Sequence, residues 1–562
     1  MILLGDNFPN DSALAADLAV VGAGPAGIAV ALEVAAQGLD VILIESGYEK
    51  ANPDAQRLAE AADWDGSLHA PMSLAVRRVL GGTSTIWGGR CVPYDRIDFE
   101  NRDYISAVTW PVTYDELLPY YQRACDWLGC GRAAFDIARM EHLPPAIVPG
   151  LIDDAVSTAS FERWTLSTNF AHAYGEKLRR SRRVRVITGL TCTEVAARAS
   201  AQRTEGLIGR TLTGKRVTIR ARAYVLACGG LETTRLLLAS PDLNGRPLGD
   251  HSGQLGRWYM GHVGGVIARV RFCTPARQTI YGYERDVDGT PVRRRLSIAS
   301  AVQLKHELPN AIGFLANPDL ADPRHRNGIL SLAYLALRSP FGERIAPAAQ
   351  RVKVAEGDPR GWSDRATRLH VDNVMRDFPS VVSFAFKAGM RRFHARGHGT
   401  PGLFAAYSGE NCYPLQYHGE QIPNRQSQVT LADDRDAVGM PRLKIDLKFS
   451  QSDVDGILRC HQIWNEYLRD KGCGRLEYLS REPGQVVWNE LGAGTHQLGT
   501  TRMSMRPQDG VVDKNLAVHG FANLFVASSS VMPTSGQANP TFMVMVFALR
   551  LADHLGKYIG RI

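Results

Sequence analysis

The segment from Asp17 to Glu45 constrains the fold of this chain more than any other. A short apolar run, Asp17–Val21, leads directly into Gly22-Ala-Gly-Pro-Ala-Gly27, and an alanine-rich stretch of helical character follows over residues 28–37. A second apolar run, Val41–Ile44, closes on Glu45, which stands 18 residues after Gly27. This spacing predicts a strand, a tight turn, a helix and a second strand. Because both strands are apolar throughout, we expect a parallel sheet that is buried on both faces.

Each glycine of this turn has a separate physical task. Gly22 permits the tight turn, Gly24 allows the backbone to approach a pyrophosphate, and Gly27 allows the helix to pack closely on the strand. The start of the helix offers free N–H groups and the positive end of its dipole to phosphate oxygens. Glu45 is placed to accept hydrogen bonds from a ribose diol. The segment therefore predicts a dinucleotide-binding site, although by itself it does not separate NAD from FAD.

Composition narrows the class of protein. The chain has 562 residues, of which 44% are hydrophobic and 22% charged, and this excludes a largely disordered chain, a collagen and a small disulfide scaffold. The formal net charge of +8 is spread along the chain, so we expect solvated surface charge and no nucleic-acid partner. The densest basic cluster, Arg391–His398, has the same interpretation.

The cysteines and the N-terminus indicate the compartment. Nine cysteines are scattered without a CxxC pair, which argues against a disulfide framework and a zinc site, so that no metal is expected. Their pattern fits a reducing compartment. Residues 1–17 lack a basic and then apolar signal pattern, and the sequence has no run of 18 apolar residues. We therefore expect a cytoplasmic protein without an integral membrane segment.

Strand-like runs of one layer are far apart in the sequence. Val184–Ile187, Tyr224–Ala227 and Asn523–Ala527 share the apolar character of the first two. Between about 265 and 485, alternating stretches such as Gln428–Leu431 and Arg442–Leu447 are typical of strands with one solvated face. We expect an α/β fold: a Rossmann-like domain assembled from discontinuous segments, and an α+β substrate domain with a mainly antiparallel sheet. The expected boundaries are 15–100 for the first nucleotide-binding segment, 101–183 for a connecting and lid region, 184–265 for the second segment, 266–484 for the substrate domain, and 485–562 for the C-terminal segment with the candidate catalytic residues.

Three further motifs point to chemistry. The loop Gly81–Gly89 has four glycines in nine residues, so its backbone can lie flat against a bulky planar ligand. Tyr224–Ser240 combines a strand, two glycines and an amphipathic helix, and His496 precedes an Asn539-Pro540 pair that has the form of a helix N-cap and first helical residue. The alternatives are a plain surface loop, ordinary strand–helix packing and a structural histidine.

Together these blocks resemble the glucose-methanol-choline (GMC) oxidoreductases over about Asp17–Gly556, and within them the branch of fructose and gluconate dehydrogenases and pyranose 2-oxidases. The resemblance implies FAD in the discontinuous domain, His496 as catalytic base and Asn539 as its partner. The cofactor-binding residues that it implies are, for the pyrophosphate, ribose and adenine, Gly22, Gly24, Pro25, Ala26, Gly27, Glu45, Ser46 and Cys192; for the flavin, Arg78, Gly82, Thr83, Ser84, Trp87, Gly88, Gly89, Asn539, Pro540 and Thr541; and, from the second strand end and the C-terminal block, Ala227, Cys228, Gly229, Thr233, Ser528 and Ser529.

Two positions depart from the family pattern. Ile86 stands where pyranose 2-oxidases carry the histidine that bonds covalently to FAD, so we expect FAD to be bound non-covalently. Ser528 stands where many members have Asp or Gly, although a serine still donates to a phosphate or ribityl oxygen. For the substrate, the polar stretch with Gln416, His418 and Gln421 is a candidate contact zone for sugar hydroxyls.

The expected activity is oxidation of a CH–OH group of a sugar, glycoside or cyclitol, with hydride transfer to flavin N5 and a histidine base. A simpler or aromatic alcohol is the alternative substrate. A flavin lyase or photoenzyme is the alternative reaction, because a fold does not determine its chemistry. An NAD-dependent enzyme is a third alternative, against which the Gly81–Gly89 loop argues. The electron acceptor is left open among oxygen, a quinone and another dye-like acceptor.

Overall fold

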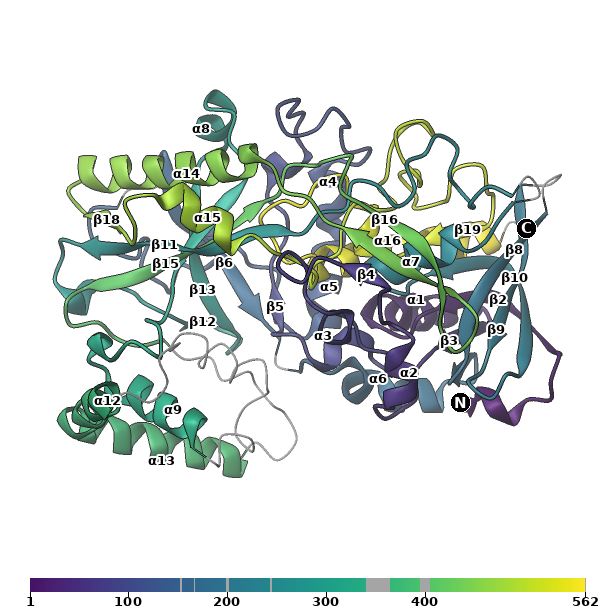
Figure 1. Ribbon diagram of the computed structural model, residues 1–562, viewed down its shortest axis with the longest axis horizontal. Coiled ribbons are helices and arrows are strands. Elements are labelled where there is room, and N and C mark those ends of the chain that lie inside the picture. The colour runs from purple at the N-terminus through teal and green to yellow at the C-terminus, as the bar shows by residue number, and fades with distance from the viewer. Residues whose placement is uncertain are drawn as a thin grey trace.

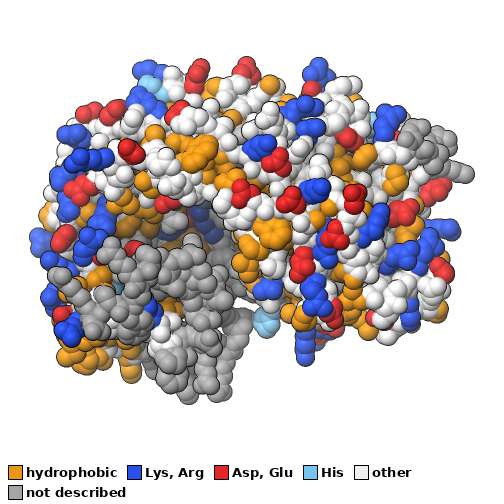
Figure 2. All heavy atoms as spheres, viewed as in Figure 1, with side chains coloured by type: hydrophobic (Ala, Val, Ile, Leu, Met, Phe, Trp, Pro, Cys, Tyr) orange, Lys and Arg blue, Asp and Glu red, His pale blue; other side chains and the backbone are white. Residues whose placement is uncertain are grey.

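Two large sheets and one small sheet organise the chain, as Figure 1 shows. The computed structural model describes residues 1–151, 154–165, 167–198, 202–242, 245–339, 364–394 and 405–560, with the side chains of these ranges except those at 198, 364, 365 and 387–394. The basic cluster Arg391–His398 lies outside the described side chains. On the face drawn in Figure 2, basic and acidic side chains are interspersed.

The first sheet holds the strand–turn–helix–strand segment that the sequence predicts. Its strands follow the order β1 (Ile2–Leu4), β7 (Val184–Thr188), β3 (Val41–Glu45), β2 (Ser12–Val21), β10 (Arg216–Leu226), β9 (Arg203–Arg210) and β8 (Thr191–Arg198), and β19 (Leu524–Val526) also pairs with β10. The pairs from β1 to β10 and the pair β10–β19 are parallel, whereas β8, β9 and β10 run antiparallel. The prediction that three distant apolar runs share this layer is confirmed, because β7, β10 and β19 are those runs.

One hydrophobic core joins the N-terminal and C-terminal parts of this sheet. Strand β3 is buried along its whole length, and helices α1 (Pro25–Ala36) and α16 (Thr541–Ile559) pack on each other beside it. Ile28 and Val30 of α1 share the core with Phe542 and Val546 of α16. The helices α5 (Tyr121–Leu128), α6 (Phe170–Arg180) and α7 (Gly230–Leu238) add to the same core. Burial of these apolar side chains is favourable, and it holds the N-terminal and C-terminal parts of the chain in one domain.

The second sheet is antiparallel throughout. Its order is β18 (Gly474–Tyr478), β11 (His262–Phe272), β15 (Cys412–Glu420), β14 (Ala311–Leu315), β13 (Pro291–Ile298), β6 (Val156–Trp164) and β5 (Arg90–Cys91), and β12 (Glu284–Arg285) pairs with β13. Helices α14 (Gln451–Asp470) and α15 (Pro483–Glu490) pack on it. The sheet is not confined to residues 266–484: β6 comes from the segment expected as a connecting and lid region, and β5 from the first nucleotide-binding segment.

A small third sheet corrects one expectation. Strands β16 (Gln428–Arg435) and β17 (Pro441–Asp446) pair with each other and with β4 (Asp63–Trp64), and not with the large antiparallel sheet. Their apolar face, with Val429 and Leu443, packs on Leu231 of α7 and on Tyr259. The alternating pattern correctly predicted strands, but it does not specify which partner covers the apolar face.

Three of the remaining helices pack on one another, and the others are short. Helices α9 (Gly328–Arg338), α12 (Asp364–Arg376) and α13 (Phe378–His394) pack together beside the second sheet in Figure 1. The shorter ones are α2 (Pro53–Arg57), α3 (Met72–Ala75), α4 (Tyr114–Leu117) and α8 (Ser300–Lys305). Among the described helices, none combines the length and the apolar character that crossing a bilayer requires.

Candidate active site

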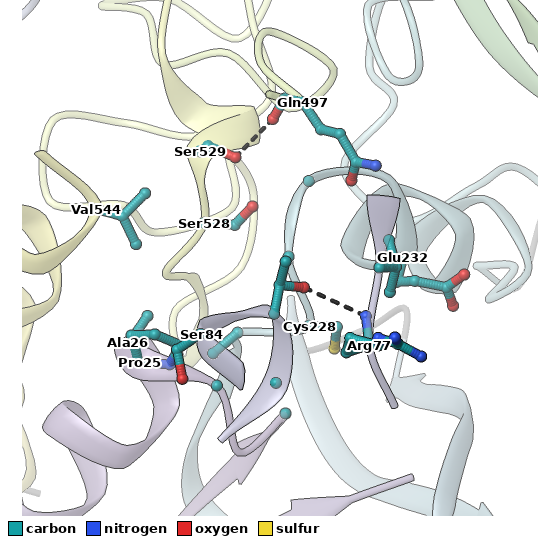
Figure 3. A pocket seen from close by; sticks show the side chains of 18 of the residues that line it. Pro25, Ala26, Arg77, Ser84, Cys228, Glu232, Gln497, Ser528, Ser529 and Val544 are labelled. Atoms are coloured by element: carbon teal, nitrogen blue, oxygen red, sulfur yellow. Dashed lines mark hydrogen bonds between the residues drawn. The ribbon is translucent and has the colours of Figure 1, made fainter. Parts of the chain in front are cut away.

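A cavity of about 500 Å³ lies where the parallel strands of the first sheet end. Ligands of open α/β sheets bind at these carboxyl ends. Figure 3 shows that its walls come from distant elements: Pro25 and Ala26 begin α1, Cys228 lies in the turn between β10 and α7, Glu232 lies in the first turn of α7, and Ser528 follows β19. Its volume is within the range of small-molecule and cofactor sites.

The glycine turn forms the cavity floor. Gly22 has φ +98°, and a β-carbon on it would lie 2.5 Å from the Ala227 carbonyl oxygen. A β-carbon on Gly27 would lie 1.9 Å from the Gly22 oxygen, whereas one on Gly24 would have no atom within 4 Å. Gly22 and Gly27 are therefore required by packing, and Gly24 leaves an open cradle beside the N-terminus of α1. This cradle fits a pyrophosphate, which needs close backbone approach and free N–H donors.

Glu45 ends β3 with its carboxylate fixed by the backbone. One oxygen accepts the Ala23 N–H at 2.9 Å and the other accepts the Gly47 N–H at 2.8 Å. Burial raises the pKa of Glu45, while these hydrogen bonds and Arg78 oppose the rise. Each carboxylate oxygen keeps a further lone pair, so the group can still accept from a ribose hydroxyl.

Arg78 lines the cavity near Glu45, and its expected contact with the flavin stays a prediction. Its Nη1 donates to Ser46 Oγ at 2.6 Å, and its Nη2 contacts the Glu232 carboxylate. Arg78 Nε has no hydrogen-bond partner among the described residues. The attraction of Glu232 explains this placement, because a buried guanidinium needs a charged partner. Glu232 was not predicted, although its position in the first turn of the helix after Cys228-Gly-Gly was a visible signal.

The loop Gly81–Gly89 lies directly against the glycine turn. The Gly81 N–H donates to the Ala23 oxygen at 2.9 Å, and a β-carbon on Gly82 would lie 3.0 Å from Gly24 Cα. Trp87 Nε1 donates to the Thr168 oxygen at 2.6 Å, and Ile86 lines the cavity with 44% of its surface exposed. Four glycines allow the loop to approach the turn this closely, as expected for a loop that contacts a planar ligand.

The structure brings most of the expected cofactor residues into this one cavity. All of them line it except Gly27, Gly89 and Thr233. Gly27 packs on the turn, and Thr233 is buried inside α7. The Gly89 oxygen accepts the Thr165 N–H at 2.8 Å behind the loop. These three residues support the wall from behind.

His496 and Asn539 meet at the cavity surface. Asn539 Nδ2 lies 2.9 Å from His496 Nε2, and both residues line the cavity. The prediction that Asn539 caps the following helix is wrong: α16 begins at Thr541, Pro540 occupies the N-cap position, and no side chain caps the helix. The side-chain amide of Asn539 instead faces His496.

Two further histidines surround His496. His496 Nδ1 lies 2.9 Å from His262 Nδ1, His262 Nε2 lies 3.2 Å from the Ser535 oxygen, and His418 Nδ1 lies 2.5 Å from the Gln537 oxygen. Burial lowers the pKa of His496 to about 4 and that of His262 and His418 well below their usual range, and the positive charge of Arg90 adds to each shift. All three rings are therefore neutral near pH 7.

The ring nitrogens of these histidines lie within 4.8 Å of one another, as they would around a metal ion. The ring geometry favours hydrogen bonding instead. His262 and His418 stack with centroids 4.4 Å apart and an interplanar angle of 25°. A metal lies in the plane of each ligating ring at 2.0–2.1 Å from its nitrogen, and two stacked rings cannot both meet that condition.

The three residues that were expected to contact the substrate lie in different surroundings, and none of them lines the cavity. Gln421 is buried, its Oε1 accepts the Gly261 N–H at 2.7 Å and its Nε2 donates to the Lys448 oxygen at 2.8 Å. Both ends of its amide are thus occupied by the backbone, so this expectation is wrong. Gln416 is exposed on β15, and His418 belongs to the histidine group.

Arg90 lines the cavity and was not predicted. Its Nη2 donates to Glu162 Oε1 at 2.5 Å, and Arg293 donates to the other oxygen at 2.8 Å. Burial lowers the pKa of Arg90 to about 10, so it keeps its charge near pH 7. The available signal was its place in the sequence, directly after Gly88-Gly89.

Comparisons with known proteins show which families and which proteins this chain resembles. A family described as "FAD dependent oxidoreductase" matches residues 17–407, and one described as "GMC oxidoreductase" matches residues 423–548. Similar proteins include 2-methyl-1,2-propanediol dehydrogenase of Mycolicibacterium austroafricanum, 23% identical over 96% of this chain and 95% of the relative, and paromamine 6'-oxidase of Streptomyces fradiae, 23% identical over 95% and 90%. A solved FAD-dependent oxidoreductase of Chaetomium thermophilum has the same fold, with a TM-score of 0.51 and 16% identity over 96% of this chain and 99% of that one.

A matched pair of substitutions separates the two tasks of the glycine turn. Gly27→Val places carbon atoms against the Gly22 oxygen, and overpacking of this kind costs ~1–3 kcal/mol or more. We expect a lower thermal unfolding midpoint and loss of FAD. A β-carbon on Gly24 has no protein atom within 4 Å, so Gly24→Val should melt as the wild-type apoprotein does while FAD binding is lost. The checks are differential scanning fluorimetry and the flavin absorbance after purification; full FAD content in Gly24→Val would contradict the cradle.

Proposed function

The chain belongs to the FAD-dependent oxidoreductases of the glucose-methanol-choline family, which act on CH–OH groups, and from that membership we propose that it oxidises a sugar, glycoside or cyclitol. The observation that carries the proposal is the contact of Asn539 Nδ2 with His496 Nε2 at 2.9 Å on the cavity wall. His496 Nε2 offers a lone pair, and Asn539 Nδ2 offers an N–H donor. A substrate hydroxyl next to them would donate to His496 and accept from Asn539.

His496 supplies the base that alcohol oxidation needs. When bound, FAD supplies the acceptor for the hydride that leaves the carbinol carbon, at flavin N5. The hydroxyl proton goes to His496 Nε2 as the C–H bond breaks, so that a carbonyl product forms without a free alkoxide. Base assistance of this kind contributes ~10²–10⁴-fold. Asn539 orients the same oxygen, and alignment of the reacting atoms contributes up to ~7–11 kcal/mol.

The cavity is also electrically suited to this reaction. The Arg90 guanidinium keeps a positive charge in the wall. Helix α16 opens on the cavity through Thr541 and Val544, and the N-terminus of a helix carries a partial positive charge. Both features favour negative charge as it develops on the substrate oxygen and on a bound flavin.

The names of the relatives support the substrate class and its alternative. Paromamine 6'-oxidase and the partly matching C-glycoside 3-oxidase of Microbacterium trichothecenolyticum favour a sugar or glycoside. 2-Methyl-1,2-propanediol dehydrogenase favours a simpler alcohol. These names include both oxidases and a dehydrogenase, so the acceptor is a separate question for experiment.

An anaerobic reduction assay tests the proposal. Purified yellow enzyme is mixed with sugars, glycosides, cyclitols, diols and aromatic alcohols, and the flavin absorbance is followed. We expect bleaching by a sugar-like substrate; bleaching by a simple diol alone would select the alternative class. Admitting air, or adding a quinone, then identifies the acceptor. Failure of every alcohol to bleach FAD-loaded enzyme would contradict the proposed activity and favour a lyase or photoenzyme.

The base should be essential and insensitive to pH near neutrality. His496→Ala should retain FAD while the rate of flavin reduction falls by ~10²-fold or more. Because only the neutral ring accepts a proton and the pKa of His496 is lowered to about 4, the wild-type rate should be constant from pH 8 to about pH 5 and fall toward pH 4. Stopped-flow reduction measures both effects, and unchanged turnover in His496→Ala would remove His496 from the mechanism.

FAD should be held without a covalent bond, because Ile86 offers no nucleophile at the cavity wall. Acid precipitation should release the yellow colour into the supernatant. An Ile86→His variant provides the contrast, since an imidazole can bond to the flavin. Colour that stays with the wild-type pellet would contradict non-covalent binding.

A further inference from the structure

His496 is surrounded by histidines and not by an acid. Its Nδ1 faces His262, and neither ring has a carboxylate within hydrogen-bond distance among the described residues. In other enzymes an acid on the outer nitrogen of a catalytic histidine selects its tautomer. We propose that His262 is a positioning residue that performs this task here, holding the proton of His496 on Nδ1 and leaving Nε2 free. The inference rests on the proposed role of His496 as base.

The direction of the hydrogen bonds follows from one fixed acceptor. A carbonyl oxygen only accepts, so His262 Nε2, 3.2 Å from the Ser535 oxygen, carries the proton of that ring. His262 Nδ1 is then the bare nitrogen. This bare nitrogen can only accept, and it lies 2.9 Å from His496 Nδ1. His496 Nδ1 must therefore be the donor. In a neutral ring this leaves a lone pair on His496 Nε2, which faces Asn539 at 2.9 Å.

Asn539 by itself does not select this tautomer. Its amide presents a donor and an acceptor, and Asn539 Oδ1 has no partner among the described residues. If the proton of His496 moved to Nε2, the amide could rotate and accept it through Oδ1. His496 would then have no lone pair for a substrate hydroxyl. The choice therefore depends on the other side of the ring, where His262 is the acceptor among the residues that the structure describes.

The ring of His262 is fixed from three sides. It begins β11 and is nearly buried, with 5% of its surface exposed. It stacks on His418 at 4.4 Å and meets the His496 ring edge-on at 4.8 Å with an interplanar angle of 86°. His418 is in turn bound to the Gln537 oxygen at 2.5 Å. The segment 535–539 thus supplies the acceptors at 535 and 537 and also Asn539, so one stretch of chain orients the whole group.

The test compares two substitutions at position 262 in the FAD-loaded enzyme. His262→Asn keeps an acceptor, because Asn Oδ1 occupies nearly the place of His Nδ1, whereas His262→Leu removes it. His461→Leu is the matched control: this histidine is also buried, with its Nδ1 2.9 Å from the Ile457 oxygen, but it lies in α14 outside the cavity wall. We expect flavin reduction to slow about tenfold or more in His262→Leu, with KM nearly unchanged, and to stay near the wild-type rate in the other two.

A direct measurement of the tautomer makes the result independent of activity. In enzyme labelled with ¹⁵N-histidine, the His496 signals are assigned by their loss in His496→Ala. We expect the Nδ1–H form in the wild type and in His262→Asn, and the Nε2–H form in His262→Leu. This readout also separates a lost tautomer from a merely weakened fold, and the wild-type spectrum decides the point even if His262→Leu does not fold.

Two results would overturn the proposal: an Nε2–H form of His496 in the wild type, or a wild-type reduction rate in folded His262→Leu. Normal flavin reduction in His496→Ala would instead overturn the proposed function. In that case the tautomer measured in the wild type would still show whether His262 fixes the ring. The two failures are therefore distinguishable.

Discussion

The close contact between the glycine turn and the end of β10 is the interaction on which the rest of the structure depends. Gly22 lies so near Ala227 that no β-carbon fits between them, and Gly27 lies even closer to Gly22. This contact brings α1 against the sheet and keeps the carboxyl ends of β2, β3 and β10 at one edge. Strand β19 then pairs with β10, so residues 527–541 follow the same edge. The cavity exists because segments separated by hundreds of residues share this edge.

The electrostatics around the three histidines follow from burial, with no carboxylate hydrogen-bonded to their rings among the described residues. His496, His262 and His418 are held neutral because burial penalises their charged forms. The positive charge of Arg90 adds to each shift, and Glu162 fixes that guanidinium at 2.5 Å. A neutral histidine with a low pKa keeps one ring nitrogen unprotonated before the substrate arrives. The positive wall favours negative charge in the transition state. Hydrogen-bond direction, and not an ion pair, therefore orients the base.

Much of the fold could be predicted from the sequence because its signals are local. The strand–turn–helix–strand segment, the distant strands β7, β10 and β19, and the glycine loop all depend on periodicity and glycine spacing, which neighbouring residues determine. The resemblance to the GMC family correctly indicated FAD and the enzyme class. The errors have physical causes. The apolar faces of β16 and β17 pack on α7 because packing partners are not encoded in alternation, and the amide of Asn539 faces His496 because a nearby histidine competes with the helix end.

What the sequence by itself determined is thus the nucleotide-binding segment, the family and the identity of a histidine–asparagine pair. The tertiary structure alone decided what surrounds that pair. Arg90, Glu162, His262 and His418 come from β5, β6, β11 and β15, and no spacing along the chain indicates that these side chains meet. The tertiary structure also decided that the amide of Gln421 forms its hydrogen bonds with backbone groups. The reason is that hydrogen bonds and burial depend on distance in space, which the sheet pairings set, whereas sequence patterns report only on neighbours along the chain.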